Sequence, residues 1–427
     1  MTHQPLEVLV VGAGIAGLSV AIALGKQGHR VVVSIAVQQD HMWAKKSHFL
    51  KEAGAAIHLP PNATALLEWL GADPATFEGV LLNKINRYDI EGDLKFQRDF
   101  ESIRHKWQAE WYLVHRVGLH NALKERALET AILHTGCTIT RIDIDRLRPS
   151  ITLSDGRNFE ADILLGADGL NSQLRKTIAP MASPPFRAGK TCYRWAIPTA
   201  DLKIHELTRG YVQEPGVFME FEGPTRRLVA YPCSDNNVFN ICAFISADPN
   251  QEADQDEGWQ TSADKGIVVD AFSHFSIGVR QMIDSAPNPI KTWSMYDMQT
   301  LPTWAIRNTA LLGDAAHPFQ PHMGQGGAMA IEDAVSIAML LPSGTKTSDI
   351  PVRLGLYQSS RRPRVEMILN FTRMNGRDDE RISRMFSFHS VTMEFVDKLL
   401  AAEMVKFMEI CVAYNEMENC TKLLEAL

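Results

Sequence analysis

The sequence is poor in cysteine, and its cysteines are not spaced for a metal or a disulfide framework. The 427 residues include six cysteines, none in a CxxC pair or in a Cys/His cluster with zinc spacing: Cys137, Cys192, Cys233, Cys242, Cys411 and Cys420. We therefore expect buried, reduced thiols. His317 and His322 stand beside prolines without a third ligand nearby, so we expect them to pack rather than to bind a metal.

An excess of positive charge and long apolar runs are also lacking. The net charge is −7 and the pI is near 6.1, with no basic tract, which argues against a nucleic-acid partner. No apolar stretch reaches the length of a membrane-spanning helix, and the N-terminus has no basic region followed by a long apolar core. We expect a cytoplasmic protein without a membrane span, present as a monomer or homodimer.

The sequence does contain a Gly-Asp loop that leads into a glycine-rich helix start. Apolar residues run into Gly313-Asp314, a proline-containing loop follows, and Gly324, Gly326 and Gly327 precede good helix formers. Glycine lets a backbone approach a ligand closely, and a helix N-terminus offers free N–H groups and the positive end of a dipole. The pattern predicts a strand, a tight loop and a helix that hold a flat, polar ligand.

A second glycine pattern lies near the N-terminus. Gly12, Gly14 and Gly17 form a GxGxxG motif between a β-rich run and a helical pattern, and a second strand follows at residues 30–33. In this βαβ context the motif is typical of a dinucleotide whose pyrophosphate lies on the helix N-terminus.

One part of the dinucleotide fingerprint is missing. An acid is expected after the second strand, about 20 residues beyond the glycines, to hold the ribose. That place falls near Ile35, and the first carboxylate is Asp40. Asp40 or a later acid could substitute, the ribose could be held otherwise, or the segment could be locally altered. The sequence does not choose among these.

Two further stretches suggest one cofactor held from three sides. A buried strand at residues 161–167 ends in Asp168-Gly169, which repeats the logic of the Gly-Asp loop. Arg116 stands between a predicted strand and a helix. There its guanidinium either makes a surface salt bridge or donates hydrogen bonds to a phosphate or a ring oxygen. The middle of the chain differs, because aromatic and β-branched runs at 187–198, 211–222, 228–232 and 238–245 predict an inserted antiparallel sheet.

These motifs, in this order and spacing, resemble the FAD-dependent aromatic hydroxylases of the 4-hydroxybenzoate hydroxylase type, and most closely the fungal salicylate-hydroxylase-like monooxygenases. The resemblance covers nearly the whole chain. It implies an α/β fold with a Rossmann-like FAD-binding domain, an inserted, mostly antiparallel substrate-binding sheet domain and C-terminal helices. We assign them to residues 1–79, 101–180 and 295–376, to residues 80–100 and 181–294, and to residues 377–427.

The resemblance also implies a cofactor, co-substrates and site residues. FAD would be the cofactor, with NAD(P)H and molecular oxygen as co-substrates. The glycines of GxGxxG would approach the pyrophosphate, Asp168 would serve FAD and pyridine nucleotide, and Asp314 would bind ribityl or ribose hydroxyls. The full set implied for cofactor binding is Gly12, Gly14, Gly17, Gly54, Ala56, Arg116, Asp168, Asp314, Gly326 and Gly327.

Arg194 and Tyr231 are the candidate catalytic residues. They stand on the central sheet at positions resembling the substrate-activating arginine and tyrosine of fungal dearomatising members. Arginine can clamp a phenolate, and tyrosine can donate a hydrogen bond or relay a proton; a sheet salt bridge and a core aromatic are the alternatives. The implied reaction is NAD(P)H-driven hydroxylation or oxidative dearomatisation of a phenolic or aromatic small molecule through a flavin hydroperoxide, with secondary metabolism as its setting.

Two other functions stay open. Residues 193–198, Tyr-Arg-Trp-Ala-Ile-Pro, half-match the Trp-x-Trp-x-Ile-Pro signature of flavin halogenases. A flavin-binding relative with impaired catalysis would carry the same motifs. The sequence identifies neither the substrate nor its regiochemistry, and it does not choose between NADH and NADPH or between hydroxylation and dearomatisation.

Overall fold

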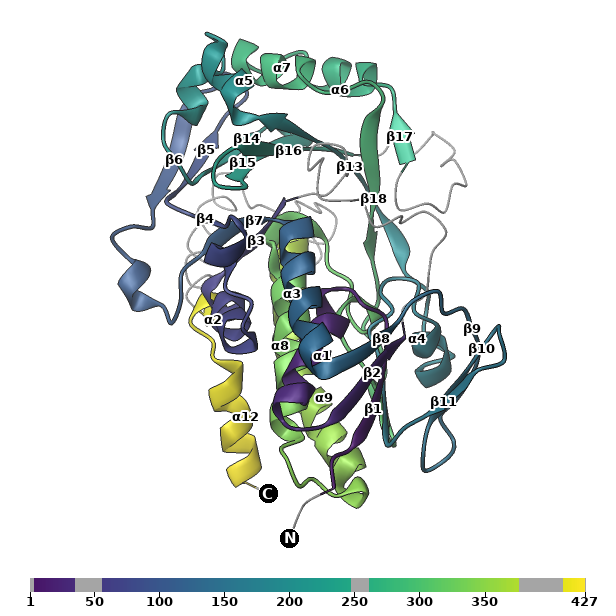
Figure 1. Ribbon diagram of the computed structural model, residues 1–427. Helices are drawn as coiled ribbons and strands as arrows, with labels where there is room; N and C mark the ends of the chain where they lie inside the picture. Colours follow the sequence, from purple (N-terminus) through teal and green to yellow (C-terminus); the bar gives the residue numbers. More distant parts are fainter. Residues whose placement is uncertain (1–3, 35–55, 247–260, 376–409, 427) are drawn as a thin grey trace, which may run out of the picture.

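The computed structural model of the chain describes residues 4–34, 56–246, 261–375 and 410–426. Figure 1 shows an α/β unit with a large sheet lying across one end of it. The long helices of the α/β unit point toward that sheet, so the loops at their ends lie between the two parts.

The α/β unit is built on a six-stranded sheet in the order β19-β20-β12-β1-β2-β8. All neighbours pair in parallel except β19 with β20. The predicted strand, GxGxxG turn, helix and strand are confirmed as β1, α1 and β2. The bounds are β1 (Glu7–Val11), α1 (Ile15–Lys26), β2 (Arg30–Ser34), β8 (Ala131–His134), β12 (Ile163–Gly166), β19 (Ala305–Ile306) and β20 (Thr309–Leu311).

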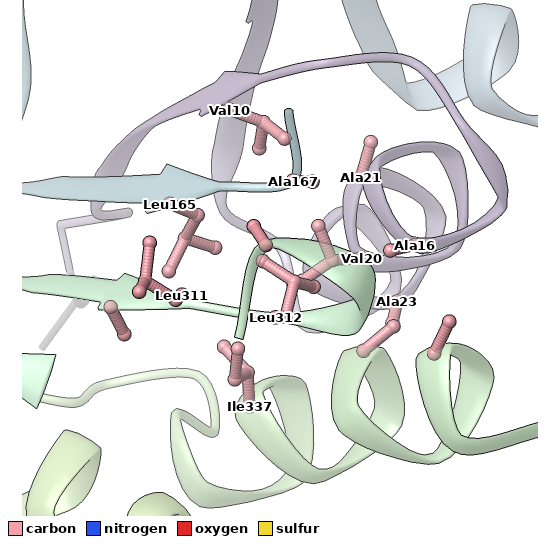
Figure 2. Close-up of a cluster of buried hydrophobic side chains, with 14 of the residues drawn as sticks. Val10, Ala16, Val20, Ala21, Ala23, Leu165, Ala167, Leu311, Leu312 and Ile337 are labelled. Carbon is pink, nitrogen blue, oxygen red and sulfur yellow. The ribbon is translucent and has the colours of Figure 1, made fainter. Parts of the chain in front are cut away.

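The core of this unit lies between the sheet and two helices, α1 and α8 (Gln325–Leu340) (Figure 2). Val10, Leu165 and Leu311 come from three neighbouring strands and are buried against Val20 of α1 and Ile337 of α8. Alanines on α1 keep its surface flat, so α8 packs directly against it. The starts of the two helices are therefore fixed relative to each other.

The large sheet has eight strands in the order β17-β18-β13-β16-β15-β14-β5-β6. It is antiparallel except where β14 pairs with β5. The inserted sheet is confirmed, and an antiparallel hairpin that turns around residues 91–93 joins it. The strands are β5 (Lys84–Tyr88), β6 (Leu94–Asp99), β13 (Phe186–Pro198), β14 (Val217–Glu222), β15 (Arg226–Cys233), β16 (Val238–Ser246), β17 (Thr261–Ala263) and β18 (Ile290–Asp297).

The two faces of this sheet bury different residues. One face packs under the helices α5 (Thr199–Ile204), α6 (Gly266–Ala271) and α7 (Ile277–Asp284), as Figure 1 shows. The other face shares a core with a small sheet of β3 (Ala56–Leu59), β7 (Tyr112–His115) and β4 (Val80–Leu81). Because side chains alternate along each strand, every second residue points toward the α/β unit.

The remaining elements complete the α/β unit. Helices α2 (Pro61–Leu70), α9 (Ile350–Asn375) and α12 (Glu416–Glu425) all contact α8, and α3 (Arg116–Thr130) contacts α1. The strands β9 (Ile139–Asp143), β10 (Ser150–Leu153) and β11 (Asn158–Glu160) form a separate antiparallel sheet, and α4 (Gln173–Ile178) follows β12. No helix in the described ranges is long and apolar enough to cross a membrane. The division into domains at the predicted boundaries stays a prediction.

Two details differ from the sequence prediction. The predicted strand at 211–222 begins only at Val217, because residues 209–212 form a 3-10 helix. The predicted segment 80–100 also divides, since β4 pairs with β7 in the small sheet while β5 and β6 join the large one. Alternation of apolar residues does not show where a strand starts or which sheet it joins.

Candidate functional site

The N-terminal glycine motif forms the turn between β1 and α1. Gly12 has φ +104°, and a Cβ there would lie 2.2 Å from the carbonyl oxygen of Ala167. A Cβ on Gly17 would lie 2.0 Å from the carbonyl oxygen of Gly12. A Cβ on Gly14, the N-cap of α1, would meet nothing within 4 Å, and no side chain caps this helix. The backbone at Gly14 thus borders open space at a helix N-terminus, which suits a phosphate.

Asp314 and Arg116 share an unusual environment. Both residues are exposed to solvent, yet the protein around them is dense enough to desolvate their charges. Burial raises the pKa of Asp314, against the opposite effect of His317 and Arg116. Burial lowers the pKa of Arg116, and the nearby Arg194 lowers it further. A side chain that water reaches, but whose charge is still desolvated by surrounding protein, is typical of the wall of a recess. We therefore place Asp314 and Arg116 on the wall of one recess.

The second glycine cluster shapes the start of α8 and confirms the predicted loop and helix. Gly324 has φ +60°, and a Cβ there would lie 2.0 Å from Nε2 of His58. A Cβ on Gly327 would meet only the side-chain ends of Ile57, at 3.6 Å, and Ile15, at 4.0 Å. Since Ile15 begins α1, the starts of α1 and α8 border the same space. No side-chain cap and no acidic residue occupies the first turn of α8, so its N–H groups are available to a ligand.

Asp168 caps a helix. Its carboxylate accepts hydrogen bonds from Oγ of Ser172 at 2.6 Å and from the backbone N–H of Gln173 at 2.7 Å, at the start of α4. These contacts fix the loop after β12. Its predicted role toward FAD and pyridine nucleotide stays a prediction. Gly326 lies in the first turn of α8, where a Cβ would be 3.2 Å from Cβ of Phe319.

Arg194 and Tyr231 lie on the face of the large sheet that points toward the α/β unit. Arg194 pairs with Cys242, and Tyr231 pairs with Asn240 two residues along the same strand, so the two side chains share a face. The guanidinium of Arg194 lies 4.3 Å from the ring centroid of Trp293. Its Nε is buried and makes no hydrogen bond within the described part of the chain.

The hydroxyl of Tyr231 is already used. It donates to the carbonyl oxygen of Ala56 at 2.7 Å, while the backbone N–H of Ala56 donates to the Asn240 side chain at 3.1 Å. The phenol ring stacks on Phe218 with centroids 5.0 Å apart. Burial raises the pKa of Tyr231 well above its usual value, so the hydroxyl stays a donor. Tyr231 therefore joins the sheet to the first residue of β3.

The same wall contains a histidine that the motifs do not mark. His58 of β3 stacks on Trp111 with centroids 5.9 Å apart and lies 5.6 Å from Phe218. Burial lowers its pKa to about 4, against the opposing charge of Glu220, so it is neutral at pH 7. No local pattern marks His58 in the sequence, because only the pairing of β3 with β7 brings it to this wall.

A buried chain of polar groups links the sheet to the loop before α8, and sequence reasoning missed it as well. Glu220 accepts from Nε of Arg87 at 2.8 Å and from Nη1 of Arg227 at 3.4 Å, and Nη2 of Arg227 lies 2.6 Å from Nδ1 of His322. Burial and Arg227 lower the pKa of His322 well below its usual value. No group of three potential metal ligands occurs among the residues described.

Comparisons with known proteins identify the family of the chain and its cofactor. A family described as an FAD binding domain matches residues 111–372, and a second model of the same description matches residues 7–49. The chain belongs to this FAD-binding family. The hispidin-3-hydroxylase of Neonothopanus nambi is 30% identical over 385 residues, which cover 86% of this chain and 87% of that protein.

Two further proteins extend the comparison. The 3-hydroxybenzoate 6-hydroxylase of Klebsiella oxytoca is 29% identical over 377 residues, which cover 87% of this chain and 88% of that protein. The structure of a salicylate hydroxylase substrate complex is similar with a TM-score of 0.78 at 22% identity, over 98% of this chain and 97% of the other. At that identity the likeness concerns the fold. Together with the family match, the relatives make this flavoprotein an FAD-dependent monooxygenase.

The residues of this monooxygenase fit FAD. The recess is bordered by two helix starts without side-chain caps, those of α1 and α8, and by the open backbone at Gly14. Asp314 and Arg116, which are accessible although protein surrounds them, lie beside it. Hydroxyl and phosphate groups are the partners that such donors and acceptors require. Gly54 and the position of the missing ribose acid near Ile35 lie outside the described residues.

Proposed function

We propose that this FAD-dependent monooxygenase uses NAD(P)H and molecular oxygen to hydroxylate, or oxidatively dearomatise, a phenolic or other aromatic small molecule. The names of the relatives support an aromatic substrate, since they act on hispidin and 3-hydroxybenzoate. The observation that carries the proposal is the guanidinium of Arg194 on the face of the large sheet that points toward the α/β unit, with a buried Nε that no described group satisfies.

In this proposal Arg194 binds and orients the substrate. Its charge favours the phenolate over the neutral phenol, and a phenolate ring is more electron-rich and easier to hydroxylate. Trp293 holds the guanidinium from one side at 4.3 Å, so the fork has a defined orientation. Arg116 adds positive charge nearby, which favours an anionic ligand further.

Other residues of the chain shape the substrate site and exclude water from it. FAD, when bound, supplies the transfer of electrons from NAD(P)H and the activation of oxygen. His58, Phe218 and Trp111 form an aromatic wall that excludes water and is neutral at pH 7. Tyr231 lies behind this wall, where its hydroxyl holds Ala56. We propose that it serves the reaction as a donor to the substrate or a proton relay when that bond opens.

The test is substitution of Arg194. Arg194→Ala keeps bound FAD but loses substrate-stimulated NAD(P)H oxidation with candidate phenols, and Arg194→Lys retains part of it. The control is Arg226→Ala, an exposed arginine on the neighbouring strand β15, which leaves turnover unchanged. Full turnover in Arg194→Ala contradicts the proposal. A chloride-dependent, halogenated product would favour a halogenase, and a yellow protein that no aromatic compound stimulates would favour a catalytically impaired relative.

A second pair of variants addresses Tyr231. If its hydroxyl takes part in the reaction, Tyr231→Phe lowers the turnover number and shifts its pH profile. If the hydroxyl only holds Ala56, the variant lowers the melting temperature and leaves both unchanged. A cytoplasmic location, a role in secondary metabolism and a monomeric or dimeric state stay predictions that fractionation, product identification and light scattering would test.

A further inference from the structure

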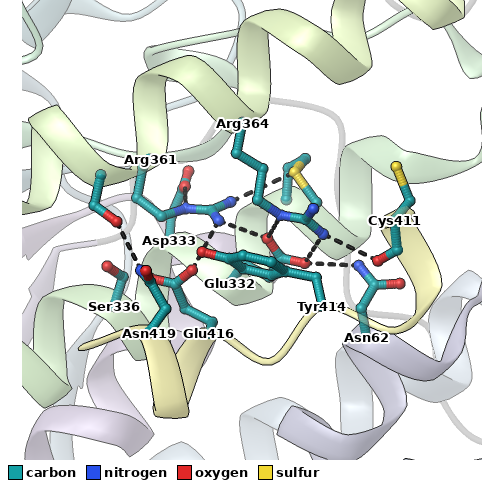
Figure 3. Close-up of polar contacts among 12 residues, drawn as sticks. Asn62, Glu332, Asp333, Ser336, Arg361, Arg364, Cys411, Tyr414, Glu416 and Asn419 are labelled. Carbon is teal, nitrogen blue, oxygen red and sulfur yellow. Dashed lines mark hydrogen bonds and ion pairs between the residues drawn. The ribbon is translucent and has the colours of Figure 1, made fainter. Parts of the chain in front are cut away.

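A buried ionic cluster lies at the middle of α8, where Glu332 and Asp333 stand. Arg361 of α9 is fully buried and contacts three carboxylates, with Nε 2.9 Å from Asp333, and Nη1 2.6 Å from Glu332 and 3.1 Å from Glu416. Figure 3 shows that these groups come from α8, α9 and the C-terminal segment. Arg364 completes the cluster with a two-pronged contact to Glu332 at 2.7 Å.

Asp333 connects this cluster to the Gly-Asp loop. One carboxylate oxygen accepts from the backbone N–H of Gly313 at 2.9 Å and lies 2.5 Å from Nε2 of His317, and the other faces Arg361. The residues that it holds, Gly313 and His317, bracket Asp314 within one short turn. Gly313 has φ +59°, and a Cβ there would lie 2.9 Å from Cβ of Ala16 on α1, so this turn has little freedom to shift.

The charge of Asp333 is maintained by its partners. Burial by itself would raise the pKa of Asp333, but His317 and Arg361 outweigh burial and hold that pKa at about 2. Arg361 is in turn held by Glu416, which belongs to α12 and is buried. The C-terminal segment is secured from a second side, because Arg364 donates to the carbonyl oxygen of Cys411 at 3.1 Å.

We propose that Asp333 is a positioning residue for FAD, which fixes the turn that presents Asp314, and that Glu416 of the C-terminal segment supports it through Arg361. A role of this kind makes the affinity for FAD and the electronic environment of the flavin depend on α12, a helix that contacts α8 and contains none of the predicted FAD-binding residues. If the cluster is purely structural, substitutions in it change only the melting temperature.

The test compares near-isosteric variants of the full-length holoenzyme. Asp333→Asn should weaken FAD binding about 10-fold or more, because a hydrogen bond to a charged group is replaced by a weaker one. FAD release is followed by flavin fluorescence on dilution, and the visible spectrum and midpoint potential are measured at saturating FAD. Glu416→Gln should shift all three in the same direction by a smaller amount, without touching a residue of the recess.

Two controls separate positioning from general destabilisation. Ile241→Val removes one methyl group from the helix-covered face of the large sheet, and Glu366→Gln removes a carboxylate from a half-buried ion pair on α9. Both should bind FAD as the parent does, even where the melting temperature falls. Parent-like affinity, spectrum and potential in Asp333→Asn would overturn the proposal. If that variant does not fold, Glu416→Gln decides alone, and parent-like values there reject the link to the C-terminal segment.

Discussion

At the scale of single residues, the three glycines of the N-terminal motif separate into two that the fold requires and one that it does not. Gly12 and Gly17 have backbone carbonyl groups where a Cβ would be, so larger residues there conflict with the protein itself. Gly14 has free space, and its conformation is one that any residue adopts. The fold therefore does not require glycine at this position, and we expect that the approach of FAD to the backbone does.

This distinction gives a prediction for Gly14→Ala. We expect the FAD-free protein to keep its melting temperature, while the affinity for FAD falls by about 10-fold or more because the added methyl group displaces the pyrophosphate. Gly210→Ala is the matched control, since Gly210 is also unobstructed and lies far away along the chain. Calorimetry and FAD titration check it. A Gly14→Ala protein with parent-like affinity would show that no ligand approaches this backbone.

A second prediction at this scale concerns His58 and acid. Its pKa in the folded protein is about 4, below the 6.5 of the unfolded chain, so the unfolded state binds the extra proton first as pH falls. This contribution to stability is present above pH 6.5 and is lost between pH 6.5 and 4, by up to roughly 3 kcal/mol. We expect His58→Asn to reduce the slope of stability against pH in that window, as measured by urea unfolding. An unchanged slope would contradict this.

At the scale of elements, the sequence predicted what local pattern encodes and missed what pairing decides. The βαβ unit, the glycine-rich start of α8 and the inserted sheet follow from residue order and are present. Asn62 illustrates the limit. An asparagine just before a run of helix formers is a common helix N-cap, but this helix begins at Pro61, and the Asn62 side chain donates to Glu332 of α8 at 2.7 Å. A partner 270 residues away is not readable from local sequence.

The contacts among α8, α9 and α12 give the third prediction. Replacing Arg361 by methionine leaves Glu332, Asp333 and Glu416 with less compensating charge, and breaking a buried ion pair costs about 3–5 kcal/mol. Its neighbour Arg362 pairs with Glu366 near the surface, where such pairs contribute at most about 1 kcal/mol. Chemical unfolding should therefore separate Arg361→Met from Arg362→Met by several kcal/mol. Equal losses would mean that the cluster adds nothing beyond packing.

At the scale of the whole molecule, the recess exists only because two units meet. One wall, as we place it, is backbone of the α/β unit, at Gly14 and Gly327, and the other is the face of the large sheet that bears Arg194. The two are joined by the bond from Tyr231 to Ala56 and by Arg227 against His322. The motifs that predicted FAD all lie in the α/β unit, and the FAD-binding family confirms the cofactor. The residues on both walls stay predictions, and those of the large sheet came only from resemblance, because substrate-facing side chains carry no fixed spacing.

The joined walls give a final prediction about how FAD stabilises the protein. A ligand that contacts one unit also stabilises any part that unfolds together with that unit. The large sheet shares a core with the small β3-β7-β4 sheet, so we expect the large sheet and the α/β unit to open together. We expect FAD to slow amide hydrogen exchange in β1, in the start of α8 and also in β15 and β16. The sheet of β9, β10 and β11 should show little change, because its strands pair with neither the six-stranded nor the eight-stranded sheet. Protection confined to the α/β unit would mean that the large sheet opens independently, and the substrate wall would then be held in place by the substrate rather than by the cofactor.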